Sequence, residues 1–369
     1  MLTKFSVSNF KGFKKPFTLD LSSPGSYAFS KECLKNGAIN NAIIYGYNGV
    51  GKSNFGYAIF DLMAQLTDRT KPSSFYENYL NAEAKEDYAH FEYEFFINGH
   101  KVLYKYDKDD YTSLRNEYFY IDNKNLISRE SINGGKFECA LEGTESLRKE
   151  FNDLSVSVLK FIKNNSELIN NEINQVFKDF FNFIEKMLLF KGLDHRVYIG
   201  PDPKLPSIDE TIIEEGLVKD FQKFINEAGI KGELAILEYN GTKKLIFDFP
   251  NRKILFGDFA STGTRSLRLF YGWFIQIIKN NINFVFIDEF DAFYHYELSR
   301  LIINKLKESG VQFILTTHNT TIMNNNIMRP DCLFLMGEKA IKPLCNCTEK
   351  ELREAHNLEK IYRAHAFKI

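Results

Sequence analysis

The residues best suited to chemistry lie in a glycine-rich stretch. Residues 46–53 read Gly-Tyr-Asn-Gly-Val-Gly-Lys-Ser, which is two glycines around four free positions, followed by lysine and serine. Such a loop turns tightly and points its backbone N–H groups at one spot, where they bind phosphate oxygens. Lys52 would reach the β- and γ-phosphates, and the Ser53 hydroxyl would hold Mg²⁺. The loop positions that would cradle the phosphates are Gly46, Asn48, Gly49 and Gly51.

The elements on both sides of this loop fit the same interpretation. Residues 41–45 form a short apolar run, as a buried strand does. A strand that runs into the loop and then into a helix places the phosphates at the positive end of the helix dipole. The alternative is a glycine-rich turn that matches by chance, and the flanking elements argue against it. The apolar residues that recur at helical spacing after the loop are Phe55, Ala58, Ile59, Leu62 and Leu66.

Two acidic residues end a second apolar run, at residues 283–289. This run predicts a buried parallel strand, and ligands of open α/β sheets bind at the carboxyl ends of such strands. Asp288 would hold Mg²⁺ through water, and Glu289 would orient and deprotonate the attacking water. Together with the glycine-rich loop, the two acids predict ATP hydrolysis.

Two further polar positions follow the same logic. Residues 311–315 predict another buried strand, and His318 follows its carboxyl end. We interpret His318 as a sensor of the γ-phosphate, the alternative being a structural histidine. Ser261 precedes a helix whose apolar face begins at Leu267. It is either a plain N-cap or part of a second phosphate-binding helix terminus.

Composition bounds the class of protein. The chain has 369 residues, of which 44% are hydrophobic and 26% charged, as in soluble globular proteins of two to three domain-sized units. A net charge of -1 argues against a wholly basic nucleic-acid coat but leaves room for a local basic groove. Five cysteines suit a reduced, cytoplasmic protein, and Cys345 and Cys347 are two possible metal ligands without partners. We expect no membrane segment, because no apolar run is long enough.

The elements that must position these residues form three predicted units. Residues 1–144 would hold the phosphate loop, a β-hairpin and an antiparallel sheet with a tight turn at Asn98-Gly99. Residues 145–230 show helical spacing and predict a helical insertion, and residues 231–369 would form the second ATPase lobe. The sheet aromatics are better explained as core than as a base-stacking platform. Lys11 either touches nucleotide or is solvated, and we favour the second.

The order of these parts resembles the ABC-type ATPases of the SMC, RecF and OLD group. A P-loop, a long insertion, a Ser-x-Gly-x signature, an acidic strand, an Asp-loop and a His strand follow one another. Residues 9–13 and Asn54 also resemble that group. Residues 352–362 look like the C-terminal signature of stand-alone ATPases of bacterial defence operons, such as those of the PARIS and Septu systems. The resemblance implies an α/β P-loop NTPase fold of ABC/SMC-head type, with a mixed sheet, an antiparallel β subdomain and a helical insertion.

The resemblance also implies roles for the candidate residues. Two protomers would sandwich two ATP molecules with Mg²⁺. Ser261 and Gly263 would contact the γ-phosphate bound by the other protomer, and Asp291 would couple the two sites. The residues that would serve one nucleotide are Lys52, Ser53, Asn54, Asp288, Glu289 and His318.

We therefore expect an ATP-hydrolysing switch that forms a homodimer or larger homo-oligomer in an anti-phage defence complex. Its effector, a nuclease or toxin, would be a separate protein, since the roughly fifty residues after His318 are too few for a typical domain. Its trigger would be a nucleic acid or a phage protein. The alternatives are a DNA-repair or chromosome-type ATPase that clamps nucleic acid, and a scaffold that turns ATP over slowly.

Overall fold

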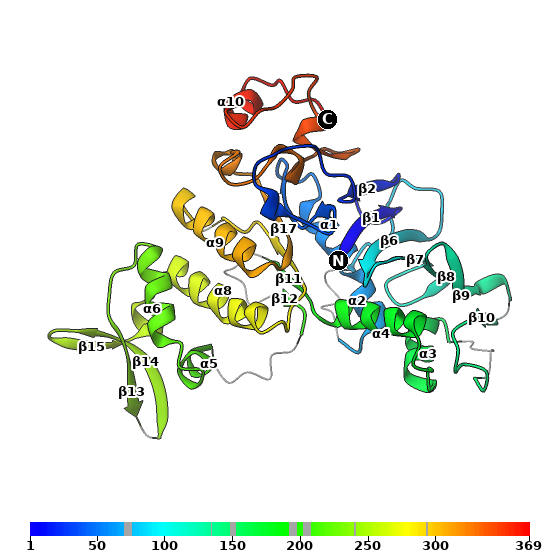
Figure 1. The fold of residues 1–369 in the computed structure, drawn as a ribbon, viewed down its shortest axis with the longest axis horizontal. Coiled ribbons are helices and arrows are strands. Elements are labelled where there is room, and N and C mark those ends of the chain that lie inside the picture. Colours follow the sequence, from blue (N-terminus) through cyan, green and yellow to red (C-terminus); the bar gives the residue numbers. More distant parts are fainter. Residues whose placement is uncertain are drawn as a thin grey trace.

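A mixed seven-stranded sheet forms the centre of the computed structural model, which describes residues 1–69, 76–133, 135–147, 153–191, 198–201, 208–239, 241–292 and 294–369 (Figure 1). Its five inner strands are parallel, and one antiparallel strand lies at each edge. The predicted strands after residues 40, 282 and 310 are confirmed. In spatial order the strands are β12 (Tyr198–Ile199), β11 (Met187–Lys191), β16 (Phe284–Asp288), β17 (Gln312–Thr317), β5 (Asn41–Tyr45), β18 (Leu333–Met336) and β19 (Ile341–Pro343).

A second, fully antiparallel sheet also has seven strands. Buried and half-buried residues alternate along its strands, and Phe91, Tyr93 and Phe95 on the inner face are 0% exposed, so the predicted core role of these aromatics is confirmed. Asn98 and Gly99 have φ of 50° and 91°, as a two-residue hairpin turn requires. In spatial order the strands are β10 (Phe137–Cys139), β9 (Lys124–Glu130), β8 (Leu114–Ile121), β7 (His100–Lys108), β6 (Ala89–Ile97), β1 (Leu2–Ser8) and β2 (Phe17–Asp20).

Helices cover the inner faces of both sheets. In α4, the Phe180 ring lies edge-on to Phe95 and Tyr104, with ring centroids 5.4 and 5.7 Å apart. In Figure 1, α8 and α9 lie side by side next to the parallel sheet. No helix within the described ranges has the length and apolar character needed to cross a membrane. The helices are α1 (Lys52–Ile59), α2 (Asp61–Leu66), α3 (Val158–Asn165), α4 (Glu172–Glu185), α5 (Ile208–Glu214), α6 (Val218–Glu227), α7 (Phe256–Phe259), α8 (Thr262–Ile278), α9 (Tyr296–Ser309) and α10 (Leu358–Arg363).

Two small sheets and several 3₁₀ helices complete the fold. The strands β13 (Leu234–Tyr239), β14 (Thr242–Phe249) and β15 (Arg252–Leu255) project from the body in Figure 1, and the first two pair as an antiparallel hairpin. The strands β3 (Leu34–Lys35) and β4 (Ala38–Ile39) pair with each other. The 3₁₀ helices are η1 (Lys31–Cys33), η3 (Ser131–Asn133), η4 (Thr320–Ile322), η5 (Pro330–Cys332) and η6 (Leu344–Asn346).

The predicted helical insertion, residues 145–230, contains α3 to α6 but also gives two strands, β11 and β12, to the mixed seven-stranded sheet. Strand β11 pairs with β16 along its whole length. Its apolar run, Met-Leu-Leu-Phe, suits a buried strand and a buried helix equally, which is why the sequence did not reveal it. The α/β fold with its mixed sheet, antiparallel subdomain and helical insertion is confirmed, and the three domain boundaries remain a prediction.

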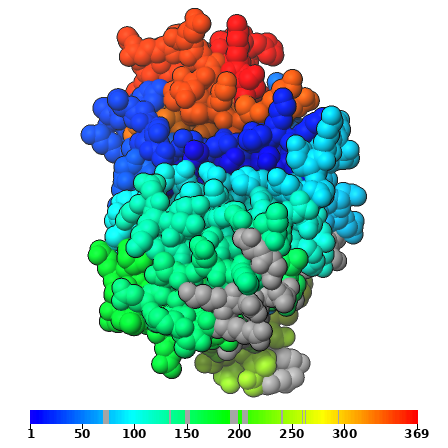
Figure 2. Space-filling model, turned by 90° about the vertical axis from the view of Figure 1, so that its right-hand side faces the viewer, coloured from blue at the N-terminus to red at the C-terminus, as the bar shows by residue number. Residues whose placement is uncertain are grey.

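One buried side chain joins the two large sheets. The Gln312 amide in β17 donates to the Leu2 carbonyl at 2.7 Å and accepts from the Leu2 N–H at 2.8 Å. Gln312 is 3% exposed, so both bonds are shielded from water. In Figure 2 the N-terminal segment, in blue, forms a band between the C-terminal elements in orange and the later strands of the antiparallel sheet in cyan and green.

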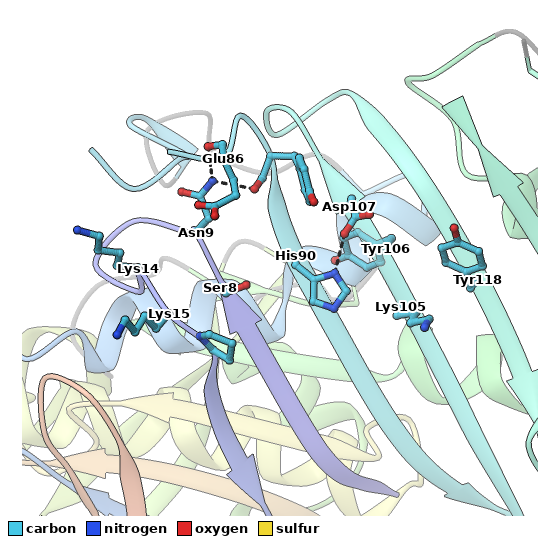
Figure 3. Close-up of a pocket in the computed structure, with 12 residues that line it drawn as sticks. Ser8, Asn9, Lys14, Lys15, Glu86, His90, Lys105, Tyr106, Asp107 and Tyr118 are labelled. Carbon is cyan, nitrogen blue, oxygen red and sulfur yellow. Dashed lines mark hydrogen bonds and ion pairs between the residues drawn. The ribbon is translucent and has the colours of Figure 1, made fainter. Parts of the chain in front are cut away.

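The outer face of the antiparallel sheet carries a groove of about 570 Å³ (Figure 3). Side chains of β1, β6, β7 and β8 line it, together with residues 14–16 from the loop between β1 and β2. This face is polar where the inner face is apolar, because successive side chains of a strand point to opposite faces.

Candidate nucleotide site

The glycine-rich loop joins β5 to α1, as predicted. A Cβ atom at Gly46 would stand 2.8 Å from Val50 Cγ1 and 3.1 Å from the Met336 carbonyl oxygen, so no side chain fits there. Gly51, the residue before α1, has φ of 105°, a backbone conformation open mainly to glycine. The loop therefore has its shape because of its glycines, and it places the N-terminus of α1 beside the ends of β5 and β18.

The Lys52 side chain lies across the loop. Its ammonium donates to the Gly46 carbonyl at 2.8 Å and to the Tyr47 carbonyl at 3.1 Å. Burial lowers the pKa of Lys52, while the carboxylates of Glu289 and Asp288 act to raise it. The predicted metal ligand Asp288 and the predicted base Glu289 are therefore close enough to influence this ammonium electrostatically.

Asp288, at the end of β16, receives hydrogen bonds from two other elements. Ser53 Oγ in α1 donates to Asp288 Oδ2 at 2.5 Å, and Thr316 Oγ1 in β17 donates to Oδ1 at 2.6 Å. Asp288 is only 4% exposed, so these hydroxyls fix a carboxylate that is largely removed from water. The structure thus brings together the two residues predicted to hold a metal. No sequence motif marks Thr316, because its position beside Asp288 follows only from the register of β17 against β16.

Glu289 has an exposed side chain on a strained backbone. Its φ is 48°, which is uncommon for a residue with a Cβ. The Glu289 N–H donates to Thr316 Oγ1 at 2.9 Å, so the threonine that fixes Asp288 also fixes the turn that carries Glu289. Strain of this kind persists where the surrounding structure holds it, often at functional sites.

Asp291 and His318 lie on neighbouring segments. Thr317 Oγ1 donates to Asp291 Oδ1 at 2.7 Å and accepts from the Asn319 N–H at 2.8 Å. Burial raises the pKa of Asp291, against the lowering effects of its bonds to Thr317 and Asn319 and of the nearby His318 ring. The His318 side chain itself is exposed. The Asp-loop is therefore fastened to the segment that carries the predicted phosphate sensor.

Ser261 and Gly263 lie at the start of α8. Ser261 Oγ accepts from the Thr264 N–H at 3.3 Å, so the plain N-cap alternative is satisfied geometrically. For the described side chains, the hydrogen bonds of Ser261 stay within its own helix, and Ser261 is exposed. The exposed Asn48 and half-buried Asn54 lie in the P-loop and in α1. A role for Ser261 and Gly263 in a neighbouring protomer remains a prediction.

Other predicted positions lie at or beyond the edge of this site. The Lys11 ammonium donates to the Glu77 carbonyl at 2.7 Å, and burial lowers the pKa of Lys11. The Tyr362 side chain of α10 bonds with Tyr47 of the P-loop, and burial together with this bond raises the pKa of Tyr362 to about 12. The resemblance pointed to α10 as a signature, but the sequence gave no sign of this contact.

The described residues, which include Cys345 and Cys347, contain no group of three or more His, Cys, Asp or Glu that would hold a metal.

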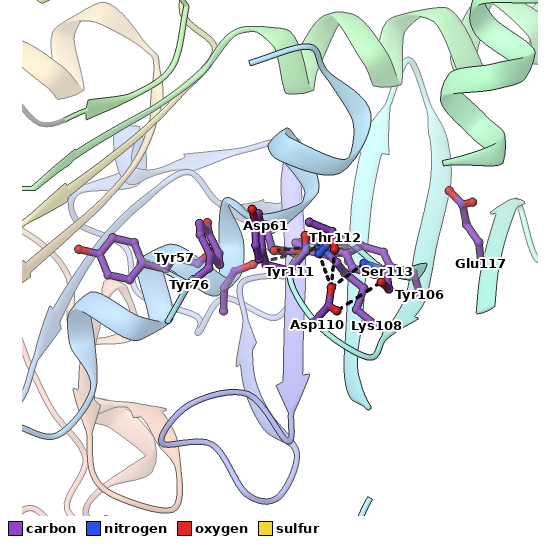
Figure 4. A network of polar contacts seen from close by, with 12 residues as sticks. Tyr57, Asp61, Tyr76, Tyr106, Lys108, Asp110, Tyr111, Thr112, Ser113 and Glu117 are labelled. Atoms are coloured by element: carbon purple, nitrogen blue, oxygen red, sulfur yellow. Dashed lines mark hydrogen bonds and ion pairs between the residues drawn. The ribbon is translucent and has the colours of Figure 1, made fainter. Parts of the chain in front are cut away.

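A buried polar network links the helices after the P-loop to the antiparallel sheet (Figure 4). Asp61 in α2 accepts from the Tyr106 hydroxyl at 2.8 Å and forms an ion pair with Lys108 at 3.2 Å. Both side chains of the ion pair are 0% exposed. The Tyr93 hydroxyl in β6 donates to the Ala58 carbonyl in α1 at 2.8 Å. The sheet is therefore bonded directly to α1 and α2.

Comparisons with known proteins add the following. A family model described as "AAA domain, putative AbiEii toxin, Type IV TA system" matches residues 42–324. A search of curated proteins finds no match. Among solved structures, the SMC head domain from Thermotoga maritima is similar at 18% identity and a TM-score of 0.46, covering 93% of this chain and 98% of that one. An SMC head bound to the C-winged helix domain of ScpA is similar at 16% identity and a TM-score of 0.48, covering 92% of this chain and 96% of that one.

Proposed function

Because this chain belongs to the family of AbiEii-type AAA domains, we propose that it binds and hydrolyses ATP as a molecular switch. Its fold is that of a P-loop ATPase of the ABC/SMC-head type. The single observation that carries the proposal is the hydrogen bond of 2.5 Å between Ser53 and Asp288. It joins the P-loop to the acidic end of β16, which is the pairing that phosphoryl transfer from a nucleotide needs.

The residues at this junction fit Mg²⁺. The Ser53 hydroxyl is an oxygen ligand of the kind Mg²⁺ prefers, and the Asp288 carboxylate would hold the ion through a bound water, since Mg²⁺ usually keeps several waters besides the phosphates. Mg²⁺ bound there would neutralise the charge that develops on the β- and γ-phosphates. Thr316 would keep the Asp288 carboxylate oriented, as partners of metal ligands commonly do.

The other residues take complementary roles. Lys52 would exchange its bonds to loop carbonyls for the β- and γ-phosphate oxygens. Glu289, exposed at the end of β16, would orient the attacking water and accept its proton. His318 would contact the γ-phosphate. Asp291, which accepts a hydrogen bond from Thr317, would couple this nucleotide site to the second one in the dimer.

The switch would operate through dimer closure. Ser261 and Gly263 of one protomer would contact the γ-phosphate held by its partner, so ATP would supply contacts only in the closed dimer. Hydrolysis would remove these contacts and release the dimer. The resemblance of residues 352–362 to ATPases of bacterial defence operons suggests a role in defence beside a separate effector. In that role the chain would sense a nucleic acid or a phage protein.

The test is Glu289→Gln, which keeps the shape of the side chain and removes its ability to accept a proton. We expect turnover to fall by about 100-fold or more, ATP to be retained and the dimer to persist in size-exclusion chromatography. Glu308→Gln, on the exposed side of α9, is the matched control. Unchanged ATP retention and assembly in Glu289→Gln would count against the mechanism. Negligible turnover in the unaltered protein would favour a scaffold, and salt-dependent DNA binding would favour a repair-type ATPase.

A further inference from the structure

The groove on the outer face of the antiparallel sheet has the size of a ligand site. Its volume of about 570 Å³ falls in the range of small-molecule pockets. Its floor is formed by neighbouring strands, with Ser8 on β1 opposite His90 on β6, and His90 opposite Asp107 on β7. In Figure 3, Lys15 stands on one side of this floor and Lys105 and Tyr118 on the other.

Two cations of the groove have no carboxylate partner within the described residues. The half-buried Lys105 ammonium lies over the rings of Tyr118 and Tyr120, 5.2 and 5.5 Å from their centroids. Lys15 is exposed and forms no ion pair there. Lys14 differs, since it pairs with Glu83 at 3.3 Å. Lys15 and Lys105 are thus free to form charge-assisted bonds to an anion.

The acid beside them is already engaged. Asp107 accepts from His90 Nδ1 at 2.6 Å and from Asn116 Nδ2 at 2.8 Å. These bonds leave His90 Nε2 as the ring nitrogen without a partner among the described groups. The other acid of the groove is Glu86, whose backbone carbonyl accepts from Asn9. The lining therefore carries three lysines against two carboxylates, one of which is bonded on both oxygens.

We propose that this groove binds a phosphate monoester carried by a ligand of about nucleotide size. Lys15 and Lys105 would match the two negative charges of the monoester, and His90, whose Nδ1–H donates to Asp107, would donate from Nε2–H to one of the phosphate oxygens. The ring of Tyr118 would line the space beside the phosphate, where a flat group can stack. The same chemistry is offered by a free phosphorylated metabolite and by the 5′-phosphate end of a nucleic acid strand.

The loop that carries Lys15 also contacts the nucleotide site. Phe13 precedes Lys14 and Lys15, and its ring would lie 3.4 Å from a Cβ at Gly51 of the P-loop. The same ring packs edge-on against Phe55 of α1, with centroids 5.9 Å apart. A ligand that draws Lys15 toward the groove would therefore act on the P-loop through Phe13. This coupling rests on the proposed ATPase function, whereas binding to the groove does not.

Isothermal titration with dTMP in saturating Mg·ADP tests the site, because ADP then occupies the P-loop. We expect Lys15→Glu and Lys105→Glu each to raise the Kd for dTMP at least tenfold. Lys124→Glu, an equal charge change on β9 of the same sheet, should stay within twofold. Absence of dTMP binding to the unaltered protein at millimolar concentration would overturn the proposal, and so would two groove variants that bind dTMP as tightly as the unaltered protein does. Lys105→Met, which keeps an apolar stem over the tyrosines, serves if Lys105→Glu does not fold.

Two further arms identify the source of the phosphate. An oligonucleotide of eight thymidines with a 5′-phosphate is compared with the same strand lacking it. Tighter binding of the phosphorylated strand than of dTMP indicates a strand end, and binding of dTMP alone indicates a metabolite. Measurable binding of both strands with the same affinity would contradict recognition of a monoester. If dTMP binds but ATP is not turned over, the proposed phosphate site in the groove is supported and the proposed ATPase function is contradicted.

Discussion

At the scale of single residues, the site depends on a threonine that no motif marks. The Thr316 hydroxyl donates a hydrogen bond to the Asp288 carboxylate and accepts one from the backbone N–H of Glu289. One hydroxyl thus orients the predicted metal ligand and the turn that carries the predicted base. Supporting groups of this kind are often nearly as important for activity as the groups they position.

Replacing Thr316 by valine keeps the shape of the side chain and removes both hydrogen bonds. We expect kcat to fall by about 10- to 100-fold, because Asp288 and Glu289 lose their common support. ATP affinity should change little, since Lys52 and the P-loop are untouched. Steady-state ATPase assays and nucleotide titration measure the two effects. The control is Thr18→Val, which changes a threonine of β2 on the outer face of the antiparallel sheet. If Thr18→Val lowers kcat as much as Thr316→Val does, Thr316 has no specific role in the site.

Sequence could predict the residues whose neighbours along the chain define them. Lys52 and Ser53 follow a glycine pattern, and Asp288 and Glu289 end an apolar run. It could not predict Thr316 or the bond between Tyr47 and Tyr362, because these depend on which strands and helices become neighbours. Only the register of β16 against β17 places Thr316 beside Asp288.

At the scale of elements, buried polar contacts hold the antiparallel sheet against its helices. The Asp61–Lys108 pair joins α2 to β7, and Glu117 in β8 accepts from the Val158 N–H at the start of α3 at 2.8 Å. Sequence reasoning found the strands and helices themselves from their periods. It missed β11 because a short apolar run does not distinguish a strand from a helix.

Lys108→Met should strongly destabilise the protein. The substitution leaves the Asp61 carboxylate buried without its cation, a change that costs about 3–5 kcal/mol in comparable cases. Urea unfolding followed by circular dichroism measures the free energy of unfolding. In the double variant Lys108→Met/Asp61→Asn the uncompensated charge is gone, so part of the loss should be recovered. A double variant no more stable than Lys108→Met would show that the ion pair is not the cause.

His100 should make stability depend on pH. Its hydrogen bond to Asp122, supported by Glu172 at the start of α4, raises the pKa of His100. The folded state therefore favours protonated His100, so this stabilisation is complete below the usual histidine pKa and is lost as pH rises through the raised pKa. The difference in free energy of unfolding between the unaltered protein and His100→Asn should shrink from about pH 5.5 to pH 9. A difference that stays constant over this range would contradict the prediction.

At the scale of the whole molecule, the Gln312 amide ties the parallel sheet to the antiparallel sheet. The P-loop side of the chain is therefore one bonded body that runs from β17 through β1 to the groove. In the proposed dimer, this body of one protomer would face α8 of its partner.

Mixing two inactive variants tests the shared site. Lys52→Ala removes the phosphate contact, and Ser261→Arg blocks the predicted contact with the partner's nucleotide. Each variant alone should be inactive, but a mixed dimer contains one site with both residues intact. Since half of the dimers in an equal mixture are mixed, ATPase activity should return to about a quarter of the normal rate. No recovery, with mixed dimers present by native mass spectrometry, would exclude a site shared in this way.

The order of strands in the parallel sheet has a consequence for biosynthesis. Strand β5, which leads into the P-loop, lies between β17 and β18. Residue 45 therefore leaves the ribosome long before its two neighbours, the second of which ends at residue 336. Until β17 and β18 have both emerged, the apolar strand β5 lacks at least one of its partners and is exposed to aggregation. We expect nascent chains that stop before β18 to be the ones that chaperones bind most strongly.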